Sequence, residues 1–212
     1  RCTHAKSLGV ECVHSPEELT DRTGKIILSL PKPEISLSVT KSLSESSATP
    51  KIIIETSTIT PQTAVTCNDI CEQKGIAYVD AAIAGGVASM AAGKITFFLG
   101  GADSNKKIAR TILNLIAEGI YDLGPVGAGM GTKVVNNGVM HALMVVLIEA
   151  FSMSNKLGVS SQTMIEILNR EEGLLRPLIH RVQERMQEGD YAGGMSVTNA
   201  RKDSVLALET AQ

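Results

Sequence analysis

The chain has 212 residues and a mass of 22.4 kDa, which is enough for one large domain or two small ones. Its apolar content of 43% and charged content of 20% are typical of a globular protein and exclude the disordered, collagen-like and coiled-coil classes. The formal net charge is −2, aromatic residues make up 3% and tryptophan is absent, so nucleic acid is not expected as the main partner.

Short apolar runs alternate with helical stretches over the first part of the chain. Ser15 is expected to cap a short helix that begins at Pro16, because Glu18 follows three residues after the cap. Helices are expected over residues 1–8, 62–74 and 103–117, and strands over residues 26–30, 52–56, 76–79, 95–99 and 119–123. The β-branched runs are typical of strands buried on both faces. They predict a parallel sheet flanked by helices, with residues 42–47 as a serine-rich surface loop.

The expected sheet also predicts where a ligand would bind. In such sheets, ligands bind outside the carboxyl ends of the strands. We therefore expect functional residues just after Leu30, Thr56, Asp80 and Leu123, where four of the expected strands end.

From Thr132 onward the chain is expected to be entirely helical. Residues 134–151 are apolar almost all round, which predicts a helix buried on most sides. Further helices are expected over residues 161–169, 174–188 and 198–211. The longest uninterrupted apolar run, residues 142–148, is too short to span a bilayer and ends at Glu149. A soluble protein inside the cell is therefore expected, with no membrane partner.

The most informative stretch runs from residue 124 to residue 137. Its four glycines, at positions 124, 127, 129 and 131, would let the backbone approach a ligand or another helix closely. Lys133 is expected in the first turn of a helix whose free N–H groups attract anions, with Asn137 one turn further on. The helix dipole and burial would both lower the pKa of the lysine toward the range useful for acid–base catalysis. Alternatively, Lys133 extends to solvent and Asn137 satisfies backbone groups.

Three other stretches could carry chemistry, and each has a plainer alternative. The Gly85-Gly86 turn could hold a carboxylate on its backbone amides, or it could be an ordinary strand-to-helix turn. The hydroxyl groups of residues 55–61 could contact a ligand, or they could cap the next helix. Lys202 and Asp203 form a charge pair that is typical of a solvated helix face.

The four cysteines give no indication of a metal site. Cys67 and Cys71 are one helical turn apart and would share a helix face. No Cys or His pair elsewhere has the spacing of metal ligands, so no metal is expected. The cysteines are expected to be free thiols in a reducing compartment.

Taken in order, these stretches resemble the β-hydroxyacid dehydrogenase family, which includes 3-hydroxyisobutyrate dehydrogenase, tartronate semialdehyde reductase and, more distantly, 6-phosphogluconate dehydrogenase. Residues 26–31 are similar to the family's strand ending in Leu-Pro, and residues 55–61 to its Asp-x-Ser-Thr-x-x-Pro segment. Residues 80–87 resemble Asp-Ala-Pro-Val-Ser-Gly-Gly, residues 127–137 resemble Gly-x-Gly…Lys-x-x-Asn-Asn, and residues 202–203 match a Lys-Asp pair.

The resemblance implies a Rossmann-like α/β domain, a long connecting helix and an all-α domain. Residues 1–125 would form part of a dinucleotide-binding domain, residues 126–157 the interdomain helix and residues 158–212 part of the helical domain. The family's glycine-rich dinucleotide fingerprint would lie before Arg1, and Gln212 falls inside an expected helix, so we expect the chain to be truncated at both ends. Arg1 would then lie where the family discriminates NADP from NAD.

The implied activity is that of an NAD(P)-dependent oxidoreductase that interconverts a small β-hydroxyacid and its semialdehyde or other carbonyl partner. Lys133 matches the catalytic lysine, the general acid and base on the substrate hydroxyl or carbonyl, and Asn137 the asparagine that orients the substrate. Gly85 and Gly86 match the backbone cradle of the substrate carboxylate. Ala84 stands where the family has a serine, so one side-chain donor to the substrate is missing.

The resemblance also implies that the cofactor is NAD or NADP. Leu30, Pro31 and Thr58 match positions that contact its nicotinamide half, and Lys202 matches a lysine near cofactor and substrate. A homo-oligomer is expected, since the small helical domain can bury little surface alone. Two alternatives stay open: a non-catalytic relative that acts as an NAD(P)-binding module, and imine reduction, a branch that usually lacks the lysine. A cytoplasmic location is expected, and an organelle matrix is also open.

Overall fold

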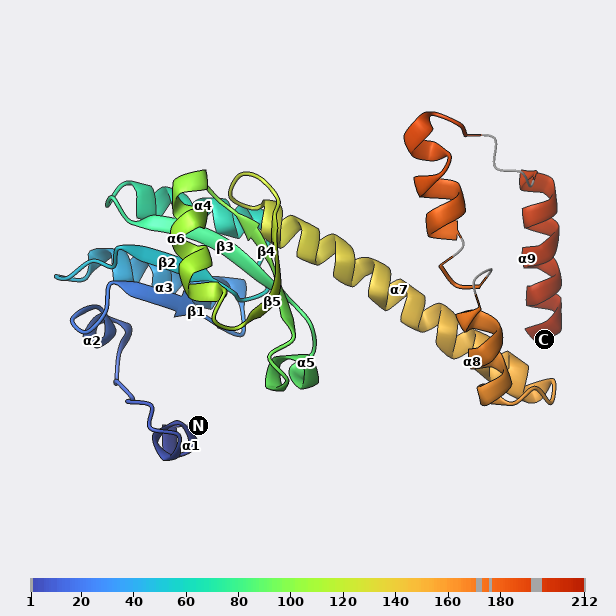
Figure 1. Cartoon of the computed structure of the whole chain (residues 1–212), viewed down its shortest axis with the longest axis horizontal. Coiled ribbons are helices and arrows are strands. Elements are labelled where there is room, and N and C mark those ends of the chain that lie inside the picture. Colours follow the sequence, from blue (N-terminus) through green and yellow to red (C-terminus); the bar gives the residue numbers. More distant parts are fainter. Residues whose placement is uncertain (1, 171–172, 176, 192–195, 212) are drawn as a thin grey trace. The chain divides into compact units, whose positions relative to one another are not determined.

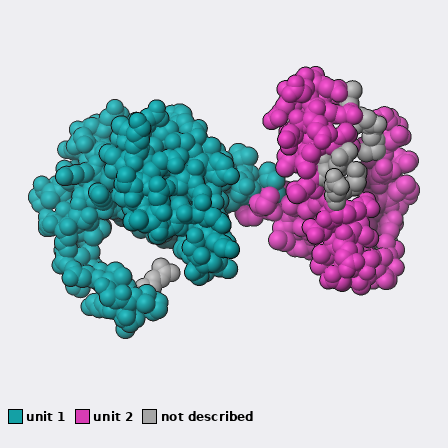
Figure 2. All heavy atoms as spheres, viewed as in Figure 1, with its two compact units in different colours: residues 1–139 teal, residues 140–212 magenta. Residues whose placement is uncertain are grey.

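The computed structural model describes residues 2–170, 173–175, 177–191 and 196–211 (Figure 1). They belong to two compact units, Arg1–Val139 and Met140–Gln212 (Figure 2). The division falls inside the long helix α7 (Ala128–Lys156), so each unit is described by itself. The expectation that Arg1 bears on the choice between NAD and NADP lies outside the described residues.

A five-stranded sheet in the order β1-β2-β3-β4-β5 forms the centre of unit 1. The strands are β1 (Lys25–Leu28), β2 (Ile52–Glu55), β3 (Ala77–Ala84), β4 (Ile95–Gly100) and β5 (Ala117–Asp122). β1, β2 and β3 are parallel, β4 is antiparallel to β3, and β5 is parallel to β4. The prediction of a fully parallel sheet is therefore wrong. Only residues 85–94 join β3 to β4, and a parallel neighbour needs a crossover of about a dozen residues or more.

The mixed sheet changes two of the four expected strand-end positions. Asp80 lies in the middle of β3, because that strand continues to Ala84. Leu123 follows β5, which runs opposite to β1 and β2, so it lies at the opposite edge of the sheet. Leu30 and Thr56 follow parallel strands and lie at the same edge.

In unit 1, α3 (Pro33–Glu45) and α4 (Pro61–Glu72) cover one face of the sheet, and α6 (Asp103–Leu113) covers the other. Unit 1 also contains the short helices α1 (Cys2–Ser7), α2 (Pro16–Thr20) and α5 (Val87–Ala91). Ile53 of β2 belongs to the core under α3 and α4, whereas Ile52 and Ile54 belong to the core under α6. Ser15 caps α2 as predicted, since its hydroxyl oxygen accepts the backbone N–H of Glu18 (3.2 Å). The Rossmann-like α/β architecture is confirmed.

The serine-rich stretch of residues 42–47, predicted as a surface loop, lies mostly in α3. Ser44 is buried there, and its hydroxyl donates to the carbonyl of Lys41 (2.7 Å). The hydroxyl of Ser46, just after the helix, donates to the carbonyl of Ser42 (3.0 Å). Hydroxyls that donate back to helix carbonyls are satisfied within the helix, so serine content alone does not exclude a helix.

Unit 2 is helical over its described residues. It contains the second part of α7, α8 (Ser161–Asn169), α9 (Val197–Ala211), a π-helix (Pro177–Gln183) and a short 3₁₀ helix (Met186–Glu188). The prediction of one helix over residues 174–188 is wrong for the described part of that range, which excludes residue 176. Pro177 has no N–H to donate, and a regular α-helix is disfavoured just before it.

Helix α7 is 29 residues long and exposes many apolar side chains. Val135 is 68% exposed and Ile148 is 59% exposed. The prediction that the helix over residues 134–151 is buried on most sides is therefore wrong for the described residues. An 18-residue window of α7 has a mean hydropathy of 1.6. By length and composition alone, this helix is long and apolar enough to cross a membrane. The run of residues 142–148 is only the uninterrupted part of this apolar helix, so its shortness does not by itself exclude a membrane span. An apolar core helix of a soluble protein has the same composition.

Candidate active site

Hydrogen bonds join the carboxyl ends of β1 and β2. The backbone N–H of Thr56 donates to the carbonyl of Leu28 (2.9 Å), and the Thr56 hydroxyl donates to the same oxygen (2.6 Å). The backbone N–H of Leu30 donates to the hydroxyl oxygen of Ser57 (2.7 Å). Because Leu30 and Ser57 come from different strand ends, this bond holds the turn after β1 against the segment after β2.

The three residues predicted to contact the nicotinamide lie at this edge. Leu30 is half-buried against the core under α3 and α4. Pro31 follows it and is exposed, and Thr58 follows Ser57 and is also exposed. The Leu30–Ser57 hydrogen bond therefore brings these predicted cofactor residues together, although they belong to segments far apart in sequence.

Glu55, the last residue of β2, is fully buried beside this edge. Its Oε1 accepts the backbone N–H of Ser57 (2.8 Å), whereas its Oε2 has no hydrogen-bond partner among the described residues. Burial raises the pKa of this carboxyl, and hydrogen bonds from Ser57 oppose the rise. In the sequence, Glu55 was singled out only as the start of the motif over residues 55–61. A carboxylate that closes the apolar run of residues 52–54 was the signal that could have singled it out.

Asp80 lies opposite Glu55 in the sheet register and fixes the start of α7. Its Oδ1 accepts the backbone N–H of Gly127 (2.9 Å), and its Oδ2 accepts that of Met130 (2.9 Å). Burial raises the pKa of Asp80, and these hydrogen bonds oppose the rise. A Cβ on Gly129 would collide with the backbone of β4, so this glycine allows the close packing of α7. The N–H groups expected to attract an anion are thus already bonded to a carboxylate of the chain.

Lys133 lies in the second turn of α7, because the helix begins earlier than expected. Its side chain is half-buried and forms no hydrogen bond or ion pair with the described residues. Burial lowers its pKa. The expected contribution of the helix dipole is not seen, since that effect falls off beyond the first turn. Asn137 lies one turn further along α7 and is also half-buried.

The start of α7 packs against the start of α4. A Cβ on Gly127 would lie 3.2 Å from the carbonyl oxygen of Pro61, and a Cβ on Gly131 would lie 3.6 Å from the ring of Pro61. Pro61 is the first residue of α4 and comes three residues after Thr58. The helix that carries Lys133 is therefore a direct neighbour of the segment that carries the predicted cofactor contacts.

The predicted carboxylate cradle lies at the carboxyl end of β3. Ala84 is the last residue of that strand and is half-buried, and Gly85 and Gly86 are exposed. Gly85 has a φ of 129°, which glycine adopts readily and other residues do not. Gly86 precedes the five-residue helix α5. The described contacts join none of these residues to Lys133, so their role in binding a carboxylate stays a prediction.

Lys202 lies on α9 in unit 2 and is exposed. Its ammonium group is 3.1 Å from a carboxylate oxygen of Asp203. This is the geometry of a solvated charge pair, which the sequence also allowed. The predicted place of Lys202 near cofactor and substrate stays a prediction.

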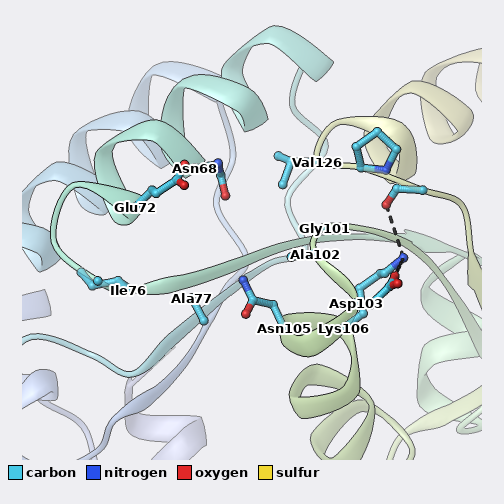
Figure 3. Close-up of a pocket in the computed structure, with 13 residues that line it drawn as sticks. Asn68, Glu72, Ile76, Ala77, Gly101, Ala102, Asp103, Asn105, Lys106 and Val126 are labelled. Atoms are coloured by element: carbon cyan, nitrogen blue, oxygen red, sulfur yellow. Dashed lines mark hydrogen bonds and ion pairs between the residues drawn. The ribbon is translucent and has the colours of Figure 1, made fainter.

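A cavity of about 820 Å³ lies apart from the predicted site residues, none of which lines it (Figure 3). Asn68 and Glu72 of α4 and Lys106 of α6 line it. The Lys106 ammonium group is nearly buried and lies 2.8 Å from Asp122 and 3.0 Å from Asp103. The hydrogen bond with Asp122 raises the pKa of Lys106. Lys106 was not among the predicted site residues, although its i, i+3 spacing from Asp103 indicates an ion pair. Its ion pair with Asp122 links α6 to the end of β5.

The structure shows no metal centre in the residues that it describes, since no group of three or more His, Cys, Asp or Glu side chains is placed to hold an ion. Cys67 and Cys71 share a buried face of α4, and all four cysteines are free. Burial raises the pKa of Cys71 to about 12, which makes its thiol unreactive at neutral pH.

The chain matches two protein families along its length. Residues 1–124 match the family described as the NAD binding domain of 6-phosphogluconate dehydrogenase. Residues 127–212 match the family described as the NAD-binding domain of NADP-dependent 3-hydroxyisobutyrate dehydrogenase.

Curated relatives include several dehydrogenases. The 2-(hydroxymethyl)glutarate dehydrogenase of Eubacterium barkeri is 32% identical over 158 residues, which are 74% of this chain and 52% of that protein. The NAD-dependent L-serine dehydrogenase of Pseudomonas aeruginosa is 32% identical over 76% of this chain and 56% of that protein. The mitochondrial 3-hydroxyisobutyrate dehydrogenase of Homo sapiens is 26% identical over 99% of this chain and 65% of that protein. The chain thus spans between about half and two thirds of the length of these relatives.

Solved structures show the same fold. Mycobacterium tuberculosis 3-hydroxyisobutyrate dehydrogenase, solved with L-serine, matches 82% of this chain and 60% of that chain, with a TM-score of 0.74 and 29% identity. An imine reductase from Streptomyces aurantiacus matches 100% of this chain and 77% of that chain, with a TM-score of 0.84 and 16% identity, a likeness of fold alone. Because the first family match covers more than half of the residues, the chain belongs to the β-hydroxyacid dehydrogenase family.

Proposed function

We propose that the protein containing this chain is an NAD(P)-dependent oxidoreductase that interconverts a small β-hydroxyacid and its carbonyl partner. The observation that carries the proposal is Lys133, a half-buried lysine whose pKa is lowered by burial and which has no counter-ion among the described residues. Burial favours the neutral amine of this lysine, which is the form that can accept a proton from a substrate hydroxyl group. The relatives' names support the substrate class, since L-serine, 3-hydroxyisobutyrate and 2-(hydroxymethyl)glutarate all carry a hydroxyl group on the carbon β to a carboxylate.

The edge of the sheet that carries Leu30, Pro31 and Thr58 fits a dinucleotide. Pro31 and Thr58 are exposed there, and the Leu30–Ser57 hydrogen bond fixes the two segments relative to each other. Dinucleotides bind such sheets at the carboxyl ends of parallel strands, as these are. The nicotinamide, when bound, supplies or accepts the hydride. We assign Leu30, Pro31 and Thr58 to the nicotinamide half.

The chain's own residues provide proton transfer and orientation. In the direction of reduction, the Lys133 ammonium group donates a proton to the substrate carbonyl oxygen; in the direction of oxidation, its neutral amine accepts the hydroxyl proton. Burial increases the neutral fraction of the lysine and so favours the second step. Asn137, one turn away, holds the substrate beside the lysine. The backbone amides of Gly85 and Gly86 hold the substrate carboxylate.

The test is an activity assay on the full-length protein that contains this chain. NAD⁺ and NADP⁺ are each supplied with L-serine, 3-hydroxyisobutyrate and 2-(hydroxymethyl)glutarate, and cofactor reduction is followed by absorbance. We expect turnover with at least one pair. Cofactor binding without turnover on any hydroxyacid would instead support the non-catalytic binding module, and the absence of both would refute the proposal.

We further propose that the protein works as a homo-oligomer. Many apolar side chains of α7 are exposed in unit 2, including Met144, Val145 and Ile148, each more than half exposed. Apolar surface of this extent on one helix is typical of an interface. A second copy that covers α7 would remove it from water.

A further inference from the structure

Glu55 is a buried acid that the mechanism above does not use. It is fully buried, and one of its carboxylate oxygens, Oε2, has no hydrogen-bond partner among the described residues. Burying a carboxylate with an unsatisfied oxygen costs free energy that an apolar residue would not. Stability alone therefore does not account for an acid at this position, which points to a role for the oxygen that is bonded.

That oxygen begins a short series of contacts that ends at the predicted cofactor edge. Oε1 of Glu55 accepts the backbone N–H of Ser57 (2.8 Å) and so fixes the backbone two residues further on. The Ser57 hydroxyl oxygen then accepts the backbone N–H of Leu30 (2.7 Å). The register of β1 and β2 ends at the pair Leu28 and Glu55, so beyond this pair the Leu30 N–H bonds to a side chain and not to the neighbouring strand.

We propose that Glu55 is a positioning residue for the dinucleotide: acting through Ser57, it fixes the backbone of Leu30 and thereby the turn that faces the nicotinamide half of the cofactor. This inference rests on the proposed function and deepens it. Glu55 itself touches no ligand. What it supplies is an acceptor, so a side chain that keeps an acceptor oxygen within reach of the Ser57 N–H retains the function.

The experiment compares variants that differ in this acceptor alone. Glu55→Gln keeps a carbonyl oxygen, whereas Glu55→Met has a similar length and no such acceptor. Glu55→Asp is the conservative variant, since an aspartate oxygen bonds readily to the backbone N–H two residues on. Ser57→Ala removes the hydroxyl that accepts the Leu30 N–H and keeps the backbone N–H that Glu55 accepts. Thr40→Val is the matched control, because Thr40 is a buried residue of α3 that takes no part in the contacts between Glu55, Ser57 and Leu30.

Two quantities are measured on the full-length protein. The first is amide hydrogen exchange at Leu30 without cofactor, which reports the Leu30–Ser57 bond directly. The second is the dissociation constant of NAD(P)H, measured by fluorescence titration. Glu55→Met and Ser57→Ala should each speed exchange at Leu30 and weaken cofactor binding by about three- to ten-fold, the effect of one lost hydrogen bond. Glu55→Gln, Glu55→Asp and Thr40→Val should match the wild type in both.

The double variant separates a relay from two independent effects. If Glu55 acts only through Ser57, adding Glu55→Met to Ser57→Ala should change cofactor binding no further. Additive losses would overturn the proposal, as would normal exchange at Leu30 or normal cofactor binding in both Glu55→Met and Ser57→Ala. A wild-type protein that binds neither cofactor would refute the proposed function itself, and this inference with it. Should Glu55→Met fail to fold, Glu55→Gln carries the test, because faster exchange at Leu30 or weaker cofactor binding in Glu55→Gln would overturn the claim that an acceptor oxygen at position 55 is sufficient.

Discussion

Replacing Gly129 by alanine should lower the free energy of unfolding of unit 1, whereas the same change at Gly138 on the same helix should raise it. A Cβ at position 129 would collide with the carbonyl oxygen of Phe98 and lie 3.0 Å from Oδ2 of Asp80. The obstacle is backbone, so α7 must move away from β4. That movement also strains the two hydrogen bonds that Asp80 accepts from Gly127 and Met130.

The magnitude follows from two opposing effects. Overpacking a buried contact costs about 1–3 kcal/mol, and weakening the Asp80 hydrogen bonds adds about 1 kcal/mol or more. The higher helix propensity of alanine offsets up to about 1 kcal/mol of this loss of stability. We therefore expect Gly129→Ala to lower the free energy of unfolding by about 2 kcal/mol. Gly138 lies on the same helix with no atom within 4 Å of its added Cβ, so Gly138→Ala should raise that free energy by about 0.5–1 kcal/mol.

Urea unfolding followed by circular dichroism measures both variants against the wild type. Hydrogen exchange at Gly127 and Met130 shows whether the start of α7 has loosened. The two variants should differ in sign. Equal effects of Gly129→Ala and Gly138→Ala would refute the reasoning, because they would mean that α7 does not approach β4 closely at Gly129.

Four further predictions concern the site and its assembly. Lys133→Ala should lower kcat by roughly 10²- to 10⁴-fold with little change in cofactor affinity, whereas alanine at the exposed Lys107 should leave kcat unchanged; near-normal turnover without Lys133 would exclude it as the proton donor. Ala84→Ser should lower KM for an ordinary β-hydroxyacid by adding a donor worth about 1.5–3 kcal/mol, and an unchanged kcat/KM across a panel of hydroxyacids would remove position 84 from the site. Burial raises the pKa of Glu55, so its contribution to stability is present below its unfolded pKa of about 4.3 and is lost as pH rises through its folded pKa; the melting temperature of Glu55→Gln should therefore rise relative to that of the wild type as pH increases above about 4.3, and a difference that stays constant with pH would contradict this. Val145→Asp, at an exposed apolar position of α7, should shift the full-length protein toward monomer in sedimentation, and a wild type that is already monomeric at micromolar concentration would exclude the oligomer.

The sequence by itself determined the elements whose signals are local. The helix start at Ser15 and Pro16 depends on residues within one turn, and the structure has it as predicted. The strand over residues 52–56 was identified from its β-branched run, and α8 was predicted with its observed bounds, Ser161–Asn169. The order of the motifs along the chain was also sufficient to predict the family, and the two family matches confirm that prediction.

Some local patterns gave wrong predictions, because a neighbouring or distant group changes the structure that the pattern alone favours. Serines predicted a loop where α3 continues, since their hydroxyls are satisfied by helix carbonyls. Residues of high helix propensity predicted one continuous helix over residues 174–188, whereas the structure has a π-helix that begins at Pro177. The apolar character of α7 predicted burial, but composition does not show which surface covers a helix.

Only the tertiary structure decided which strands are parallel and what the buried acids do. The direction of β4 depends on how residues 85–94 turn back, and no residue within β4 reports it. Asp80 reaches Gly127 across 47 positions of the chain, and Ser57 reaches Leu30 across 27. A hydrogen bond between side chain and backbone depends on distances that arise only when strands and helices pack. The sequence therefore indicated which segments matter, and packing alone determined that one buried acid holds the helix of Lys133 while its neighbour Glu55 bonds to the segment that holds Leu30.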